Sequence, residues 1–189
     1  MTIYVAMLRG VNVGGKNLVK MADLQRSFLE LHLGRARTYI QSGNVLFESD
    51  EREEHLRKMI EQRIEGAFRF SATVVLRTAE ELGQIISNRP FSDEDISLTD
   101  SASDVEHLYV ALLTQPPEQE RLERLDVLNG ETEEYRLRGR DVYLLLRKGF
   151  RNSRLVDNLP RLGVPFTVRN WKTLSKLEEL ARSMTTVGT

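Results

Sequence analysis

The chain has 189 residues, with 27 basic and 28 acidic side chains and no cysteine. This balance excludes a global positive field that would attract nucleic acid, although a local basic patch is compatible with it. The lack of cysteine excludes disulfides, thiolate metal sites and a cysteine nucleophile. No apolar run approaches the roughly 20 residues of a membrane-spanning helix, so we expect a cytoplasmic protein that does not enter a membrane.

The first half of the chain predicts the order strand, helix, strand, strand, helix, strand, helix. Unbroken apolar runs such as IYVAML are typical of buried strands, and apolar residues at spacings of three and four indicate amphipathic helices. Gly34 is expected to end the first helix, and Thr78 with Glu81 predicts a capping box that opens the last one. The expected elements are a strand at 3–8, a helix carrying Met21, Leu24, Phe28 and Leu31, a hairpin at 37–48, a helix carrying Leu56, Met59, Ile60, Ile64 and Ala67, a strand at 72–77 and a helix at 78–86.

The second half predicts the same order again. Its first strand, LYVALLT, repeats the pattern of IYVAML, with Tyr109 in the place of Tyr4 and Ala111 in the place of Ala6. The expected elements are a strand at 108–114, a helix carrying Leu122, Leu125 and Leu128, a hairpin at 133–147 that turns near Gly139, a short helix within 151–163, a strand at 166–170 and a helix at 173–184.

The repeated order indicates an α+β fold: a tandem pair of ferredoxin-like βαββαβ units, each followed by a short helix, with antiparallel sheets. We expect an N-terminal ferredoxin-like unit at residues 1–87, an acidic linker at 88–104 and a C-terminal ferredoxin-like unit at 105–189. The two halves are only weakly similar in sequence, so the inference of an internal duplication rests on the order of elements.

The strands do not alternate between apolar and polar residues, as strands with one solvated face do. IYVAML, VYLLL and ATVVL are apolar throughout. We therefore expect both faces of each sheet to be covered, with Tyr4, Ala6, Tyr109 and Ala111 mostly buried. The covering layer would be the other sheet, a trailing helix or a second copy of the chain in a homodimer.

The segment LRGVNVGGKN, residues 8–17, resembles a phosphate-binding P-loop, because Gly10, Gly15 and Lys16 match G-x-x-x-x-G-K. Asn17 stands where Ser or Thr should bind magnesium, and the expected sheet is antiparallel, whereas P-loop enzymes use a parallel one. A nucleotide-hydrolysing P-loop enzyme is therefore disfavoured. Two interpretations remain open: a glycine-rich turn without a ligand, or an anion cradle of backbone N–H groups with cations nearby.

A second motif, QSGN, lies at the predicted turn of the first hairpin. Turn chemistry alone explains Ser, Gly and Asn there. Gln41, Ser42 and Asn44 also offer donors and acceptors with little charge, which suits the recognition of a base edge or a sugar hydroxyl.

A third motif, RNWKT, ends the last strand and opens the last helix. Asn170 or Thr173 can cap that helix. Trp171, the single tryptophan, is either a packing anchor between the halves or a stacking platform for a base. The basic stretch RKGFRNSR, residues 147–154, is either a solvated loop or a loop that contacts phosphate.

The histidines give no metal site. His32, His55 and His107 are scattered, and none belongs to a zinc-binding H-E-x-x-H motif. We expect neither a metal nor a cofactor.

The three motifs together resemble a bacterial family, the domain-of-unknown-function 1697 family. The matching positions are Arg9, Gly10, Asn12, Gly14, Gly15 and Asn17, then Tyr39, Gln41, Ser42, Gly43 and Asn44, then Arg169, Asn170, Thr173, Lys176 and Leu177. The chain departs from the family pattern at Arg154, where a lysine is usual. The resemblance implies a pair of ferredoxin-like units, but it implies no activity.

The motifs are rich in amide, hydroxyl and cationic groups and poor in carboxylates and histidines, so they suit anion binding better than proton transfer. We expect a binding module for a nucleotide, a phosphorylated small molecule or a nucleic acid. Two alternatives stay open: an enzyme that acts on a phosphorylated small molecule, and a structural or protein-interaction role. The candidate ligand-binding residues are Arg9, Asn12, Gly14, Gly15, Lys16, Asn17, Gln41, Ser42, Asn44, Arg169, Asn170, Lys172 and Lys176.

Overall fold

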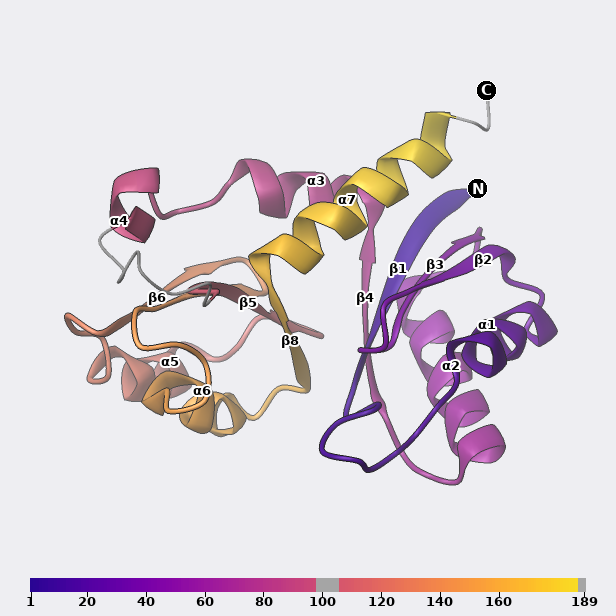
Figure 1. The fold of residues 1–189 in the computed structure, drawn as a ribbon, viewed down its shortest axis with the longest axis horizontal. Helices are drawn as coiled ribbons and strands as arrows, with labels where there is room; N and C mark the ends of the chain where they lie inside the picture. The colour runs from indigo at the N-terminus through magenta and orange to yellow at the C-terminus, as the bar shows by residue number, and fades with distance from the viewer. Residues whose placement is uncertain (98–105, 187–189) are drawn as a thin grey trace. The chain divides into compact units, whose positions relative to one another are not determined.

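A computed structural model describes residues 1–97 and 106–186 of the chain (Figure 1). The chain divides into two compact units: unit 1 comprises residues 1–84 and 175–189, and unit 2 comprises residues 85–174. The elements of the first half are β1 (Thr2–Arg9), α1 (Met21–Glu30), β2 (Gly34–Tyr39), β3 (Asn44–Ser49), α2 (Glu53–Phe68), β4 (Thr73–Thr78) and α3 (Ala79–Ser87). They are followed by α4 (Asp93–Ser97), β5 (Leu108–Leu113), α5 (Gln119–Asp126), β6 (Glu133–Arg138), β7 (Asp141–Leu146), α6 (Arg154–Asn158), the 3-10 helix η1 (Leu159–Leu162), β8 (Phe166–Asn170) and α7 (Trp171–Thr186).

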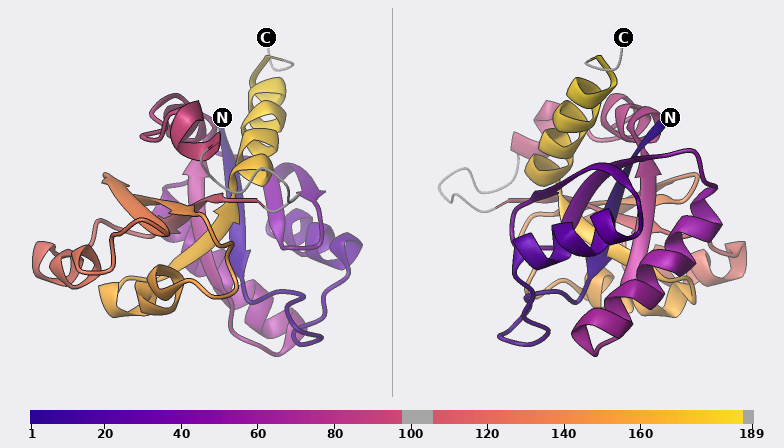
Figure 2. Two further views of the ribbon diagram at one scale, coloured as in Figure 1. Left: turned by 60° about the vertical axis from the view of Figure 1, so that its left-hand side comes forward. Right: turned by 90° about the vertical axis from the view of Figure 1, so that its right-hand side faces the viewer.

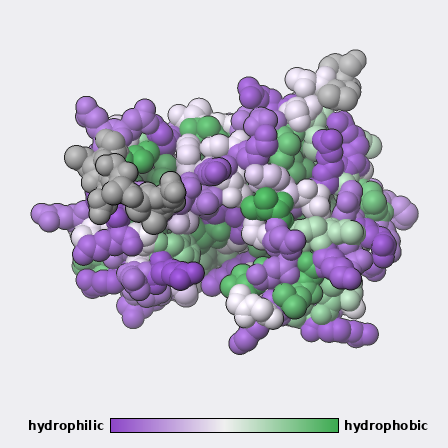
Figure 3. Space-filling view, in the orientation of Figure 1, coloured by the Kyte–Doolittle hydropathy of each residue, from purple (hydrophilic) through white to green (hydrophobic). Residues whose placement is uncertain are grey.

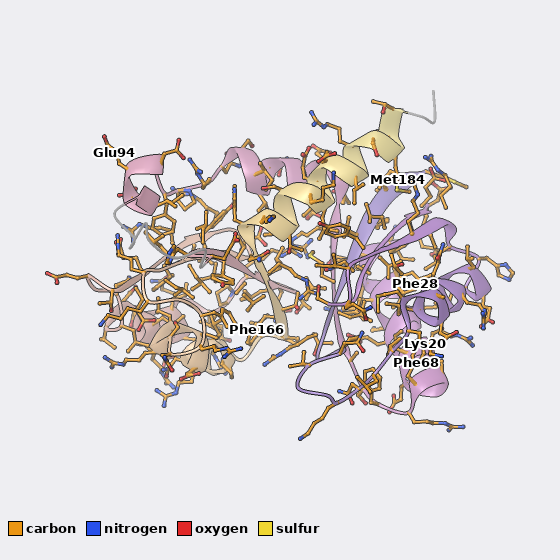
Figure 4. All side chains as sticks on the ribbon, viewed as in Figure 1. Lys20, Phe28, Phe68, Glu94, Phe166 and Met184 are labelled. Atoms are coloured by element: carbon orange, nitrogen blue, oxygen red, sulfur yellow. The ribbon has the colours of Figure 1, made fainter. Side chains whose placement is uncertain are left out.

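Unit 1 contains a four-stranded antiparallel sheet in the order β2-β3-β1-β4. Helix α1 packs against β2 and helix α2 against β4, so both helices cover one face of the sheet, as the right-hand view of Figure 2 shows. The core between the helices and the sheet includes Phe28 of α1, labelled in Figure 4, and Phe47 of β3, whose ring centroids lie 5.4 Å apart. Burial of such aromatic side chains is a main source of stability for a unit of this size.

Both sets of side chains along β1 are buried. Tyr4 and Ala6 belong to the core under α1 and α2, and the alternate residues Val5 and Met7 are fully buried as well. The absence of apolar–polar alternation in this strand therefore correctly predicted that both of its sides would be covered.

Unit 2 repeats this arrangement, with a four-stranded antiparallel sheet in the order β6-β7-β5-β8. Helices α5 and α6 lie on one side of the sheet in Figure 1. The core there includes Ala111 of β5 and Phe166 of β8, which Figure 4 labels. Tyr109 is only half-buried and lies at the margin of this core, so the expectation of burial holds for Ala111 and only in part for Tyr109.

The two sheets have the same strand order when their strands are numbered from the first strand of each unit. That order, with the first and third strands in the centre, is the order of a ferredoxin-like unit. The prediction of a tandem pair of ferredoxin-like units with antiparallel sheets is confirmed.

Three local features differ from expectation. The first helix ends at Glu30, before Gly34, and the left-handed residue after it is His32, with φ of 58°. Gly34 instead opens β2, where its backbone lies close to Glu48. In the second half, helix α5 stops at Asp126, so Leu128 lies beyond it.

The segment expected to be a linker is more structured than its composition indicates. Phe91 is 3% exposed, and the short helix α4 follows it. The backbone N–H of Ser92 donates to Asp95, and the N–H of Asp95 donates to the Ser92 hydroxyl, which is a capping box. The expected linker residues 98–104 lie outside the described residues.

The capping box predicted at the start of α3 is present. The Thr78 N–H donates to Glu81 Oε2 over 2.8 Å, and the Glu81 N–H donates to Thr78 Oγ1 over 3.1 Å. The expected boundaries at residues 87 and 105 stay predictions. The compact units differ from them in two respects: unit 2 begins at Ile85 and includes the expected linker, and residues 175–189, most of α7, group with unit 1.

Candidate anion-binding loops

The glycine motif forms a small hairpin after β1. Val13 and Lys16 pair in antiparallel fashion, and the Lys16 N–H donates to the Val13 carbonyl over 3.0 Å. Between them Gly14 and Gly15 both have positive φ, 57° and 75°, as a two-residue hairpin turn requires. Helix α1 begins only at Met21. The segment is therefore built as a hairpin turn, a geometry that is compatible with both interpretations drawn from its sequence.

The side chains of Asn12 and Asn17 stabilise this hairpin. Asn12 Oδ1 accepts the Val19 N–H over 2.8 Å, and Asn17 Nδ2 donates to the Gly10 carbonyl over 2.9 Å. Both asparagines have positive φ, which asparagine tolerates better than most residues. Their amide groups hold the loop in shape.

The QSGN motif forms the loop between β2 and β3. Asn44 is fully buried, and its Nδ2 donates to the Tyr39 carbonyl over 3.1 Å and to Ser42 Oγ over 2.9 Å. Ile40 has φ of 48°, a conformation that costs a β-branched residue free energy and that often marks a functional loop. Its side chain is 45% exposed.

These two loops lie against each other at one end of the unit 1 sheet. Asn12 Nδ2 donates to the Gln41 carbonyl over 2.9 Å, and the Leu8 N–H donates to the Gly43 carbonyl over 2.8 Å. A Cβ atom on Gly43 would lie 3.2 Å from Leu8 Cβ and 3.3 Å from Val11 Cβ, so only glycine fits there. Two of the three sequence motifs are thus brought together within unit 1.

We call residues 9–20 and 40–44 the two-loop surface. Arg9, Lys16 and Gln41 are exposed on it, and neither segment contains an acidic residue. Apolar residues are exposed there too: Val13 is 64% and Leu18 74% exposed. Figure 3 shows such apolar patches among hydrophilic ones at its lower edge, where the glycine hairpin lies in Figure 1. The surface therefore combines cations, amides and apolar side chains.

The third motif belongs to unit 2, where its residues have structural partners. Arg169 is 8% exposed and donates from Nη1 to Thr167 Oγ1 over 2.8 Å and to the Val168 carbonyl over 2.9 Å. Burial lowers the pKa of Arg169 to about 10. Asn170 Oδ1 accepts the Thr173 N–H over 2.9 Å, which confirms that Asn170 caps the last helix.

The remaining candidates lie in α7. Lys172 is exposed, and its backbone N–H donates to Glu106 over 3.1 Å. Lys176, in the part of α7 that groups with unit 1, forms an ion pair of 2.7 Å with Glu179. Trp171 is half-buried, and the guanidinium of Arg89 lies 5.9 Å from its ring centroid. A shared cleft for all three motifs stays a prediction.

Two arginines that sequence reasoning missed have unusual positions. Arg77 of β4 is 1% exposed, although it is charged. Arg35 of β2 has φ of 50° beside a register shift between β2 and β3, and its guanidinium donates to Glu48 over 2.7 Å and to the Met184 carbonyl over 3.1 Å. Neither position has a local sequence signal: Arg77 is covered by the folded sheet, and the contacts of Arg35 come from β3 and α7.

Within the described residues, no helix is both long and apolar enough to span a membrane. In residues 1–97 and 106–186, no three histidine or acidic side chains gather where they could hold a metal ion.

Comparisons with known proteins agree with the fold. The sequence model of a family described as "Protein of unknown function (DUF1697)" matches residues 1–143. A solved structure, described as that of the conserved bacterial protein SP0830 from Streptococcus pneumoniae, is similar with a TM-score of 0.70 and 23% identity over 95% of this chain and 98% of that one. At this identity the likeness concerns the fold alone. No curated protein matches the chain.

Proposed function

Because the chain belongs to DUF1697, a family of proteins of unknown function, we propose its function from the chemistry of its own loops. The protein is a binding module for an anionic ligand, which is either a nucleotide or a nucleic acid. The observation that carries this proposal is the contact between the glycine hairpin and the QSGN loop, because it gathers exposed cations and amides on one surface.

Lys16 is the central residue of the proposed site. It is exposed beside the Gly14–Gly15 turn, and the turn positions carry no side chains that would keep a phosphate away from the backbone. An ammonium group next to accessible backbone is a common way to bind phosphate. Gln41, exposed on the neighbouring loop, supplies a neutral donor and acceptor for a base or a sugar.

The alternatives draw less support. An enzyme acting on a phosphorylated small molecule requires a group that moves protons, and residues 9–20 and 40–44 contain no histidine, aspartate or glutamate. A structural role is supported for Asn12, Asn17 and Asn44, because their side chains bond to the chain itself. We therefore assign the ligand contacts to Lys16, Gln41 and the glycine turn.

We also propose that the two units arose by tandem duplication, since their strand orders are the same. The contribution of Arg169, Asn170, Lys172 and Lys176 to a ligand site stays a prediction, as do the cytoplasmic location and the homodimer.

Fluorescence anisotropy with labelled nucleotides and short oligonucleotides tests the proposed function. Lys16→Ala should weaken binding about tenfold, the loss expected from one charge-assisted contact to phosphate. It should leave the melting temperature unchanged because the side chain is exposed. Lys58→Ala is the matched control, since Lys58 is an exposed lysine on α2 paired with Glu54. Equal binding by both variants, or no binding by the parent protein, would contradict the proposal.

A further inference from the structure

The basic stretch at residues 147–154 of unit 2, which follows β7, is held at its first end by residues 131–134, which lie in and just before β6. Arg147 Nη2 pairs with Glu134 Oε1 over 2.7 Å, and Arg147 Nη1 donates to the Glu131 carbonyl over 3.0 Å. The Arg147 N–H also donates to the Thr132 carbonyl over 2.9 Å. The first cation of the loop is thus fixed, and it shares the carboxylate of Glu134 with Arg136.

The C-terminal end of the 147–154 loop is fixed by the carboxylate of Glu133. Glu133 accepts hydrogen bonds from the Ser153 hydroxyl over 2.6 Å, from the Arg154 N–H over 3.2 Å and from the Leu155 N–H over 3.1 Å. Ser153 Oγ in turn accepts the Val156 N–H and caps α6. The backbone N–H groups at the start of α6 are therefore satisfied by the protein's own side chains.

Between these ends, two tight turns present an aromatic ring. The Gly149 N–H donates to the Leu146 carbonyl over 3.0 Å with Gly149 at φ of 79°, and the Ser153 N–H donates to the Phe150 carbonyl over 3.4 Å. The Phe150 ring lies 4.9 Å from the Tyr109 ring, centroid to centroid, yet it is 36% exposed. Phe150 thus packs against Tyr109 while part of its surface stays open to solvent.

Three further cations of the same loop have no carboxylate partner among the described residues. Lys148, Arg151 and Arg154 are exposed, and none of them forms an ion pair with a carboxylate in the described part of the chain. Arg147 at the anchored end differs, because Glu134 compensates it. The acidic residues of β6 thus hold the ends of the loop and leave its apex positively charged.

From this geometry we propose that the 147–154 loop binds single-stranded nucleic acid. An unpaired base stacks on Phe150, and Lys148, Arg151 and Arg154 contact the phosphates on either side. An exposed ring needs an unstacked base, which a duplex does not offer, and the cations supply the contacts that follow a single-stranded backbone. The inference goes beyond the proposed function, because it names single-stranded nucleic acid as the ligand class and adds an independent contact on unit 2.

The test uses the full chain and fluorescence anisotropy with a labelled single-stranded RNA of about 12 nucleotides, within the range that one stacking surface covers. Phe150→Ala should weaken binding roughly 5- to 100-fold, as the loss of one stacked base does. Phe150→Tyr keeps the ring and should bind like the parent protein, which separates stacking from misfolding.

The charge contribution is read from the salt dependence. Lys148→Ala and Arg151→Ala should each lower the slope of log affinity against log salt by about 0.7, the value for one phosphate contact on a single strand. Arg124→Ala, which removes an exposed arginine of α5 paired with Glu120, should leave the slope unchanged.

Three results would overturn the inference: equal binding by Phe150→Ala and the parent protein, equal affinity for a duplex of the same length, or no binding of the RNA by the parent protein. If Lys16→Ala weakens binding while Phe150→Ala does not, the site on unit 1 stands and this inference fails. If Phe150→Ala weakens binding while Lys16→Ala does not, the stacking site stands and the unit 1 site fails.

Discussion

Arg77 and Arg169 occupy equivalent positions in the two ferredoxin-like units. Arg77 of β4 lies opposite Val5 of β1, and Arg169 of β8 lies opposite Val110 of β5. Each arginine donates from Nη1 to the carbonyl of the residue before it, over 2.7 Å and 2.9 Å respectively. Both are buried. A shared position, burial and hydrogen bond support the proposal of tandem duplication.

This equivalence predicts matched effects on stability. A buried guanidinium has to be paired, and both arginines have interactions in addition to the bond to the preceding carbonyl. Arg77→Ala and Arg169→Ala should therefore each lower the free energy of unfolding by about 3 kcal/mol, because they leave buried partners uncompensated. Urea unfolding measures this, with Arg37→Ala as the control, since Arg37 is exposed on β2. A loss from only one of the two buried arginines would contradict their equivalence.

Substitutions at Gly43 and Gly14 distinguish the cost of backbone strain from the cost of close packing. Both have positive φ, but a Cβ on Gly43 would meet Leu8 and Val11, whereas a Cβ on Gly14 would meet nothing within 4 Å. Gly14→Ala should cost about 1 kcal/mol from the left-handed backbone alone. Gly43→Ala should cost about 1–3 kcal/mol more through overpacking. Urea unfolding of both variants checks the difference, and equal losses would show that the two loops do not pack as closely as described.

The raised pKa of Tyr143 predicts how the stability of the protein changes at alkaline pH. The Tyr143 hydroxyl donates to the Ile85 carbonyl over 2.9 Å, and burial, with a smaller contribution from Asp141, raises its pKa to about 12. The unfolded chain releases this proton near pH 10 and the folded protein near pH 12, so stability is lost as the pH rises from 10 to 12. Tyr143→Phe should cost about 1 kcal/mol at pH 8 and flatten the decline above pH 10.

Urea unfolding at several pH values, for the parent protein and for Tyr143→Phe, measures this effect. The comparison isolates Tyr143 because Arg169, whose pKa burial lowers, contributes with the opposite sign in both proteins. A decline of the same steepness in both proteins would contradict the assignment.

Glu133 predicts the rigidity of the basic loop. Its carboxylate accepts hydrogen bonds from Ser153, Arg154 and Leu155, so Glu133→Ala should lower stability by about 2 kcal/mol and increase amide exchange at those residues. Glu131→Ala is the control, because Arg147 contacts only the backbone carbonyl of Glu131. Hydrogen exchange that is unchanged in Glu133→Ala would show that the end of the loop is held by other contacts.

Periodicity and turn chemistry were sufficient to predict the order of elements within the two βαββαβ units, the two hairpins and the capping box of Thr78 and Glu81, because those signals lie within a few residues. Helix α4, in the expected linker, was not predicted. The predicted end of the first helix was wrong because the left-handed conformation is taken by His32 and not by a glycine. Most of α7 groups with unit 1, which local sequence patterns could not predict because the grouping depends on packing between distant parts of the chain.

The candidate site was predictable in composition but only partly in geometry. The glycine and QSGN motifs were recognisable from their polar residues, yet the bond from Asn12 to Gln41 joins residues 29 positions apart and has no local signal. The burial of Arg77 and Arg169 depends in the same way on the surrounding sheet, since a charged residue in a strand is ordinarily expected at the surface. The roles of such residues can be recognised only from the folded structure.

The most direct test of the proposed function is a two-dimensional amide NMR titration of the protein with a short single-stranded oligonucleotide. The proposal predicts concentration-dependent shifts of the Gly14, Gly15, Lys16 and Gln41 amides, with those of Arg57 and Lys58 on α2 unchanged. An absence of shifts at millimolar ligand, or shifts confined to residues outside the two-loop surface, would contradict it.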